Sequence, residues 1–177
     1  MATELFARQG YHATGVAELG RAVGLGAGAL YHHIGSKEEL LLIIVRAHLE
    51  HVHAVGTRLL AQEGSARDKL RELARDHMRL VAHRRTELLV MLREVDSLTG
   101  ARRDDMLRLR DAVEQIWNEV VRQGIASGEL RGLDPLFVKV VLGAINYSLL
   151  WYSEAGSDTP ERLADRILDM VLSDRKV

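Results

Sequence analysis

The feature that most constrains the fold is a pair of short helical patterns separated by one glycine, within the first 35 residues. Apolar residues recur at helical spacing from about Gly15 to Val23, and a second helix is expected from about Ala27 to Ile34. Gly24 can adopt the left-handed conformation that ends the first helix, and Leu25 can fill the corner. Two short helices joined by a tight, glycine-bearing turn predict a helix-turn-helix.

Helices are also expected on both sides of this motif. The segment Glu4–Gln9 is typical of the end of a helix, and Gly10 is its stop signal. Ser36 followed three residues later by Glu39 is a capping box, which predicts a long helix from Lys37 to about Gln62. The chain is therefore expected to begin with a three-helix bundle that contains the helix-turn-helix.

The rest of the chain is predicted to be helical as well, so the expected fold class is all-α. The composition agrees, since 47% of residues are hydrophobic, 28% are charged and only two are proline. We expect a DNA-binding domain over residues 1–46 and a larger ligand-binding and dimerisation domain over residues 47–177. Helical segments are expected over 66–83, around the apolar run 88–92, over about 25 residues ending at Gly128, over 136–152 and after Pro160. In the first of these, one face is expected to carry Leu70, Leu73, Ala74, His77, Leu80 and Val81.

Several function classes find no support in the sequence. There is no cysteine, no glycine-rich phosphate loop and no paired-carboxylate or nucleophile motif, so neither an enzyme nor a cofactor is expected. His48 and His51 share a helical face but His53 does not, so no metal site is expected. The chain shows no signal peptide or confident membrane span, and the default location is cytoplasmic.

The first 45 residues resemble the N-terminal signature of the tetracycline-repressor (TetR) family of bacterial transcription regulators. The matching positions, in order and without a gap, are Leu5, Phe6, Gly10, Tyr11, Thr14, Val16, Leu19, Gly24, Leu25, Gly28, Leu30, Tyr31, His32, His33, Ser36, Lys37, Glu38 and Leu40. The resemblance implies a ligand-responsive regulator, in most cases a repressor, that binds a double-stranded operator. It also implies a fuller first helix and a basic arm ahead of Ala2, so this chain is expected to start part-way into that helix.

The DNA-contact residues are predicted from this resemblance and from the needs of a recognition helix in the major groove. Small residues bring backbone close to DNA, hydrogen-bonding side chains reach phosphates, and Thr14 can cap the second helix and present its hydroxyl. The predicted contacts are Thr14, Ala27, Gly28, Ala29, Tyr31, His32 and Lys37. The alternative is that Tyr31 and His33 pack in the core of the small domain and that His32 is merely exposed.

The charge of this segment departs from what DNA binding favours. The basic and acidic side chains of the first 46 residues balance: Arg8, Arg21, Lys37 and Arg46 against Glu4, Glu18, Glu38 and Glu39. Where Gly26, Ala27 and Ala29 stand, the family commonly has polar or basic residues. A neutral surface gains little from counterion release, so operator affinity is expected to be modest.

The segment 136–152 is apolar nearly all round, and its helix is expected to have Asp134 as N-cap and Pro135 at the first helical position. Burial on two sides is expected, and in the resembled family the last two helices pair with their copies in a second subunit. A homodimer through the last two helices is therefore expected, reading a near-palindromic operator.

The effector site is predicted among apolar side chains of the larger domain with a few polar groups. The candidate lining residues are Met91, Met106, Arg110, Trp117, Asn146, Tyr147 and Trp151. Residues 143–152 resemble the subgroup of repressors that governs fatty-acid and sterol catabolism, which implies a small hydrophobic effector, such as an acyl-CoA. A ligand that respaces the two recognition helices would lower the affinity for DNA. The alternative function is a helical protein-interaction module without specific DNA binding.

Overall fold

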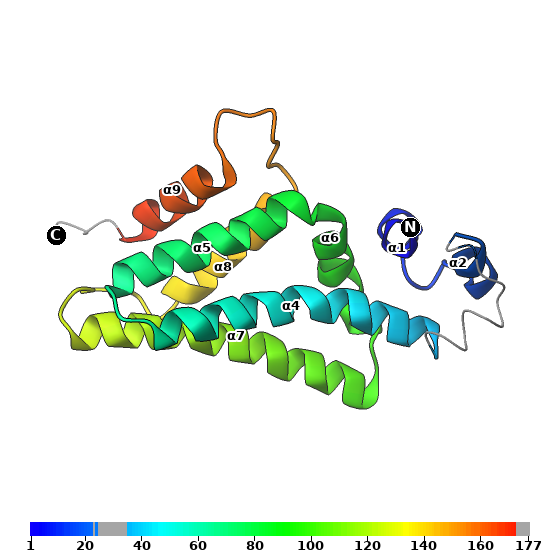
Figure 1. Ribbon diagram of the computed structural model, residues 1–177, viewed down its shortest axis with the longest axis horizontal. Coiled ribbons are helices and arrows are strands. Elements are labelled where there is room, and N and C mark those ends of the chain that lie inside the picture. Colours follow the sequence, from blue (N-terminus) through cyan, green and yellow to red (C-terminus); the bar gives the residue numbers. More distant parts are fainter. Residues whose placement is uncertain (23, 25–34, 173–177) are drawn as a thin grey trace. The chain divides into compact units, whose positions relative to one another are not determined.

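The computed structural model describes residues 1–22, 24 and 35–172. Over these residues every regular element is a helix, which confirms the expected fold class (Figure 1). The predicted recognition helix, from Ala27 to Ile34, lies outside the described residues. The elements are α1 (Ala2–Gln9), α2 (Val16–Ala22), α4 (Lys37–Ala61), α5 (Ala66–His83), α6 (Arg85–Glu94), the 3₁₀ turn η1 (Val95–Ser97), α7 (Gly100–Ala126), α8 (Phe137–Ser148) and α9 (Pro160–Leu172).

The chain divides into two compact units. Unit 1 comprises Met1–Leu49 and Arg84–Arg108, and unit 2 comprises Glu50–His83 and Leu109–Val177. The long helices α4 and α7 each contribute to both units. Residue 46, the expected boundary between the functional domains, lies close to the end of the first segment of unit 1, but that unit also includes α6 and the start of α7.

Unit 1 is held together by α1 packing on α6 and by a small aromatic cluster. Phe6 is 1% exposed, and its ring lies 5.5 Å from that of Tyr11. Gly10 ends α1 with a φ of +88°, and its N–H donates to the Phe6 carbonyl at 2.9 Å, as the stop signal predicted. The predicted end of the first helix is therefore present in unit 1.

Unit 2 has α5 at its centre, with α8 and α9 both packed against it and against each other (Figure 1). The helix α5 begins and ends at the predicted residues, and its predicted buried face is confirmed, from Leu70 to Val81. The α5 N-terminus is capped from far along the chain, because the Glu129 carboxylate accepts from the N–H groups of Ala66 and Arg67 at 2.8 and 2.9 Å.

The apolar helix α8 is shorter than predicted. It begins at Phe137, because Asp134 and Pro135 form a turn in which the Asp134 carboxylate accepts from Leu136 N–H at 2.8 Å. It ends at Ser148, after which residues 149–151 form a turn closed by Tyr152 N–H donating to the Ser148 carbonyl at 2.7 Å.

Among the described helices, α4 alone has the length and composition to cross a membrane. A third of the most apolar 18-residue stretch of this helix is buried in the protein. Leu41, Val45 and Val52 are among its core residues, at 0, 0 and 3% exposed. Amphipathic packing of this kind is what a core helix of a helical bundle requires.

Candidate functional site

Thr14 does not cap the second helix in the way predicted. Its side chain is 1% exposed, and its hydroxyl donates to the Gly10 carbonyl at 2.7 Å while accepting from the Gln9 amide at 3.3 Å. The backbone of Gly15 instead receives the first N–H groups of α2, from Glu18 and Leu19. The Thr14 hydroxyl thus belongs to the interior of unit 1, and in this arrangement it is not presented to a phosphate.

Lys37 also has an intramolecular role that sequence reasoning missed. Its ammonium donates to the carbonyls of Tyr11 and Thr14, both at 3.0 Å, and lies 4.4 Å from the centre of the Tyr11 ring. These contacts fasten the turn between α1 and α2 to the first residue of α4. The predicted phosphate contact of Lys37 would have to compete with them.

The other predicted DNA contacts are Ala27, Gly28, Ala29, Tyr31 and His32, and they lie outside the described residues. Their roles stay predictions, as does the alternative of core packing for Tyr31 and His33.

The start of α4 is capped by half of the predicted capping box. Glu39 N–H donates to the Ser36 hydroxyl at 3.0 Å, but the Glu39 carboxylate accepts from the Arg102 guanidinium at 2.9 Å and does not return to residue 36. Glu38 accepts from the backbone N–H and hydroxyl of Thr99, at 2.8 and 2.9 Å, and these bonds hold the pKa of its carboxyl below the ordinary value. Two acidic side chains in the first turn of α4 therefore link it to the start of α7.

The predicted effector-site residues are divided between the two units. Met91 and Met106 are buried in unit 1, at 8 and 1% exposed. Three others lie on the surface of unit 2, since Tyr147 and Trp151 are 67 and 62% exposed and the Arg110 side chain is 64% exposed and paired with Asp111. These three side chains are exposed in the described part of the single chain, and their assignment to the effector site stays a prediction.

Trp117 and Asn146 remain as candidates for the interior of unit 2. Trp117, on α7, is fully buried, and its indole Nε1 has no hydrogen-bond partner among the described residues. The Asn146 side-chain oxygen, on α8, is likewise buried, and it interacts with His77 of α5. Buried polar atoms of native proteins are nearly always paired, so Trp117 Nε1 is a place where a ligand's polar group can be received.

His77 completes the set of polar side chains in this interior, and sequence reasoning placed it only on a buried face. Burial lowers its pKa to about 4, because desolvation disfavours the imidazolium, and an interaction with the Asn146 side chain acts in the opposite direction. The ring is therefore neutral at physiological pH. A lone histidine within an apolar helical stripe was the signal that could have found it.

A row of exposed apolar side chains follows one side of α8 and its C-terminal turn. Its apolar members are Leu136, Val140, Tyr147, Leu150 and Trp151, between 51 and 67% exposed. Gly143 lies in the middle of this row, and a Cβ at this position would meet nothing within 4 Å. We call these six residues the α8 stripe. A contiguous exposed apolar row is typical of a protein interface.

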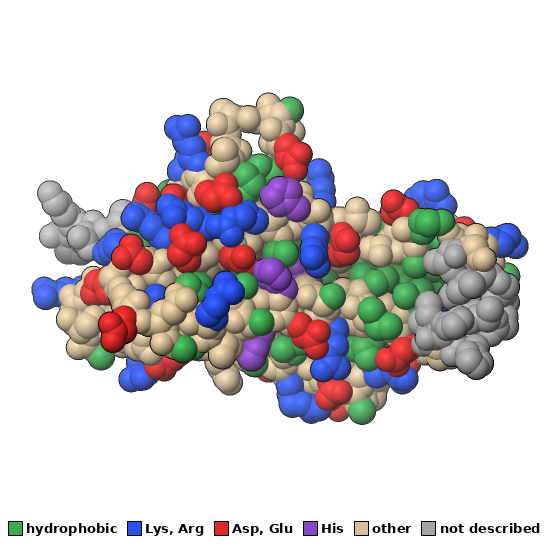
Figure 2. Space-filling view, viewed as in Figure 1, with side chains coloured by type: hydrophobic (Ala, Val, Ile, Leu, Met, Phe, Trp, Pro, Cys, Tyr) green, Lys and Arg blue, Asp and Glu red, His purple; other side chains and the backbone are tan. Residues whose placement is uncertain are grey.

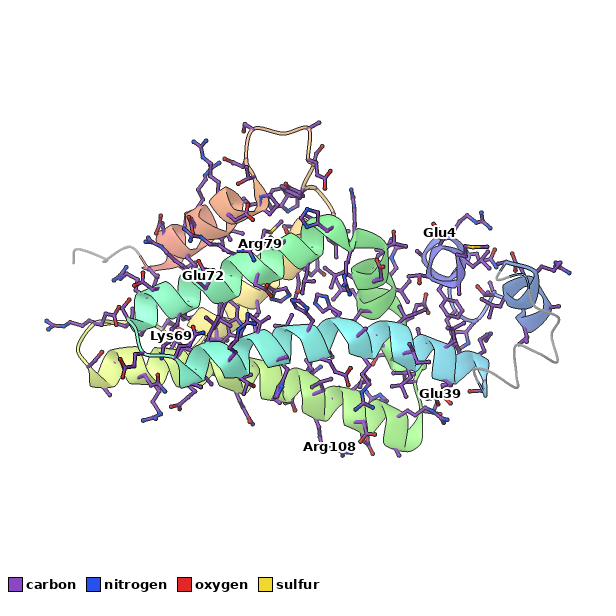
Figure 3. The ribbon with its side chains drawn as sticks, viewed as in Figure 1. Glu4, Glu39, Lys69, Glu72, Arg79 and Arg108 are labelled. Atoms are coloured by element: carbon purple, nitrogen blue, oxygen red, sulfur yellow. The ribbon has the colours of Figure 1, made fainter. Side chains whose placement is uncertain are left out.

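A different surface connects α5 to α9, and sequence reasoning missed it. Arg75 forms a bidentate ion pair with Asp165, with N···O distances of 2.9 and 2.8 Å. Arg71 pairs with Asp169 at 2.9 Å, and Arg79 pairs with Glu161 at 2.8 Å. Basic and acidic side chains alternate over these helices (Figure 2), and Figure 3 shows Glu72 and Arg79 on α5 beside α9. The four-residue spacing of these charges along each helix was the available signal.

Comparison with known proteins decides the family. Residues 63–174, more than half of the chain, match the family described as tetracyclin repressor-like, C-terminal domain. Residues 1–44 match the family of bacterial regulatory proteins called the tetR family. The chain belongs to the TetR family. It is a transcriptional regulator with a DNA-binding helix-turn-helix domain, and not an enzyme.

Individual relatives are similar over nearly the whole chain. The HTH-type transcriptional repressor KstR2 of Mycolicibacterium smegmatis is 26% identical, over 97% of this chain and 85% of its own. The TetR-family regulator PfmR of Thermus thermophilus has a TM-score of 0.87 at 32% identity, over 97 and 94% of the two chains. AibR, solved in complex with isovaleryl coenzyme A and operator DNA, has a TM-score of 0.84 at 26% identity, over 97 and 94%.

Proposed function

We propose that this TetR-family regulator is a homodimeric repressor that binds a near-palindromic operator and is released by a small hydrophobic effector, an acyl-CoA. The observation that carries the proposal is the similarity over 97% of the chain to AibR, whose structure contains an acyl-CoA and operator DNA together. The residues of this chain add support of their own, from the interior of unit 2 and from its surface.

The effector part is supported by Trp117 Nε1, a polar atom of the apolar interior that has no partner among the described residues. The dimer part is supported by the α8 stripe, because single soluble chains rarely leave such a row exposed to water. A two-fold dimer presents two copies of the helix-turn-helix to two half-sites of DNA. The effector would act by stabilising dimers whose two DNA-binding domains do not match the half-site spacing.

The test is a fluorescence anisotropy titration of the purified protein with the intergenic DNA upstream of its own gene, at several fixed salt concentrations. We expect specific binding with a shallow salt dependence, because the first 46 residues carry no net charge. Footprinting should show a near-palindromic site, and addition of acyl-CoA should release the DNA. By reciprocity, operator DNA should weaken acyl-CoA binding by the same factor.

Tyr31→Ala is the informative variant for the DNA contact, because Lys37→Ala would also remove the bonds to Tyr11 and Thr14. Loss of operator binding with an unchanged melting temperature would support the contact at Tyr31. If the unaltered protein bound no DNA at low salt, the protein-interaction module would take the place of the repressor.

A further inference from the structure

The first turn of α4 carries two carboxylates directly after Lys37, a predicted phosphate contact. Glu38 and Glu39 are the next two residues, and their side chains are 21 and 36% exposed. Carboxylates in the first turn stabilise a helix, because they lie at its partly positive end. The same two charges repel the phosphates of DNA. The stability of α4 and the binding of DNA therefore make opposite demands on this turn.

The two carboxylates are too close to Lys37 for this conflict to be avoided by distance. Consecutive residues of a helix are only about 1.5 Å apart along its axis. In water, charges influence one another over about 10 Å at 0.1 M salt. A phosphate bound at Lys37 would therefore lie within the range of both carboxylates, and DNA binding requires that part of their charge be neutralised.

Arg102, in the first turn of α7, binds both carboxylates. Its guanidinium donates to one Glu39 oxygen from Nε at 3.1 Å and from a terminal nitrogen at 2.9 Å, and to Glu38 at 3.4 Å. Thr99 adds its N–H and its hydroxyl to Glu38, at 2.8 and 2.9 Å. All four residues belong to unit 1. The guanidinium thus supplies one positive charge to two negative ones and fixes where they lie.

The neighbouring arginines of α7 have partners in their own part of the chain. Arg103 pairs with Asp96 at 3.6 Å, and Arg108 pairs with Asp105 on the same helix. Figure 3 shows Arg108 on the side of α7 away from α4. The charge of Arg102, in contrast, is directed to the start of α4.

We propose that Arg102 is a positioning residue for DNA binding, although it lies outside the helix-turn-helix domain. Its guanidinium neutralises part of the charge of Glu38 and Glu39 and holds both carboxylates towards α7, so that phosphates can approach the start of α4. The proposal goes beyond the predicted DNA contacts, which all lie in the first 46 residues. It rests on the DNA-binding part of the proposed function, and not on the operator sequence or the effector.

Fluorescence anisotropy with the full chain tests this role. The probes are the intergenic duplex and a scrambled duplex of the same length, at 50 and 200 mM salt. Arg102→Met should weaken the binding of both duplexes by about tenfold at the lower salt concentration and by about fourfold at the higher one, because one cation fewer opposes the carboxylates. Arg102→Lys keeps the charge, and its affinity should stay within about twofold of that of the unaltered protein.

Rescue separates this electrostatic role from a structural one. Glu39→Gln should tighten DNA binding on its own, and in combination with Arg102→Met it should restore the affinity to within about threefold of the original. A contact that only stabilised the fold would not be restored in this way, since the double variant also lacks the ion pair.

Arg108→Met is the matched control, because it removes the same charge from the same helix. The Arg108 side chain is 69% exposed and pairs with Asp105, so its loss should change DNA binding by less than about twofold.

Unchanged binding of both duplexes by Arg102→Met at 50 mM salt would overturn the proposal. So would a loss that Glu39→Gln does not rescue, or an equal loss in Arg108→Met. Failure of the proposed function has a different signature, since the unaltered protein would then bind the intergenic and the scrambled duplex equally well. The scrambled duplex would still measure the effect of Arg102 in that case.

Discussion

Along α9, the carboxylates of Glu161, Asp165 and Asp169 each meet an arginine of α5, whereas along α8 the outward side chains include Tyr147 and Trp151, which are largely exposed. Both surfaces belong to unit 2. The charged side chains of α5 and α9 pair within one chain, while the apolar side chains of the α8 stripe remain exposed. The contrast teaches that α9 is amphipathic towards its own chain, whereas the exposed side of α8 is the one that the proposed dimer would cover.

The largest effect is expected when charge is placed on the α8 stripe, which tests whether this surface forms the proposed dimer interface. Tyr147→Glu combined with Trp151→Glu should raise the dissociation constant of the proposed dimer by at least about a hundredfold, because two carboxylates would be buried without partners. The measurement is the mass in solution by light scattering, as a function of concentration.

Ile125→Glu is the control for this prediction. Ile125 is 53% exposed, like the members of the stripe, but it lies on α7. An unchanged mass for the double variant, or equal dissociation for the control, would remove the stripe as the dimer interface.

The two sides of α5 differ in the same way, because His77 faces the apolar interior while Arg75 and Arg79 face α9. Folding lowers the His77 pKa to about 4 from its ordinary value of 6.5. As the pH falls, the His77 imidazole is therefore protonated in the unfolded chain before it is protonated in the folded one. Its contribution to the free energy of unfolding is fully present above pH 6.5 and is lost as the pH falls towards 4. The free energy of unfolding should decrease by roughly 3 kcal/mol over this range.

Urea denaturation at pH 7, 5.5 and 4.5 measures this loss. His77→Leu should be much less sensitive to pH in this window, since the titrating group is gone. An identical pH dependence in the variant and in the unaltered protein would show that another group dominates.

Gly124 lies where its helix is tightly packed, and Gly143 lies where the helix surface is open. At Gly124 a Cβ would lie 2.6 Å from Leu130 Cδ1 and 2.7 Å from Ala66 Cβ, whereas at Gly143 it would meet nothing. Gly124→Ala should cost about 1 kcal/mol of unfolding free energy, since overpacking outweighs the gain in helix propensity. Gly143→Ala should gain about 1 kcal/mol in the monomeric double variant described above.

Thermal denaturation of both alanine variants checks this pair. In the dimer, Gly143→Ala should also weaken association, because the methyl group would enter the interface. A stabilised, fully dimeric Gly143→Ala protein would place the contact between subunits elsewhere.

The smallest effect is expected on the charged surface. Arg75→Met keeps the apolar stem but removes the two-pronged contact with Asp165, and it should cost about 1 kcal/mol, because the pair is only partly buried. The cost should shrink in 1 M salt. Arg122→Met, at a pair with a 70% exposed arginine on α7, should change little. Equal effects of the two variants would mean that the α5–α9 pairs add no more than ordinary surface pairs.

The helices could be predicted from the sequence because their signals are local. Gly10 ends α1, Ala66–His83 is α5, and the 3.6-residue stripe of α5 is buried, all as expected. The DNA contacts predicted for Thr14 and Lys37 stay predictions. What the sequence did not indicate is that both side chains also bind carbonyl groups of the α1–α2 region.

The effector site could be predicted only in part. Trp117 and Asn146 were among the candidates, and the structure buries their polar atoms, but Tyr147 and Trp151 were assigned to the same site and lie on the surface. The sequence of α8 and the turn that follows it is apolar nearly all round, so periodicity could not separate the inward side from the outward one. His77, on another helix, carried no signal that it meets Asn146.

The sequence by itself determined the fold class, the order of the helices and the membership of the family, because helix periodicity, glycine stops and the N-terminal signature are all encoded in short stretches of chain. The tertiary structure alone decided which polar atoms stay unpaired in the interior and which apolar side chains remain in water. The reason is physical: burial and pairing depend on residues that are distant in sequence, such as Arg75 with Asp165 or Glu129 with Ala66, and local propensity carries no information about such contacts.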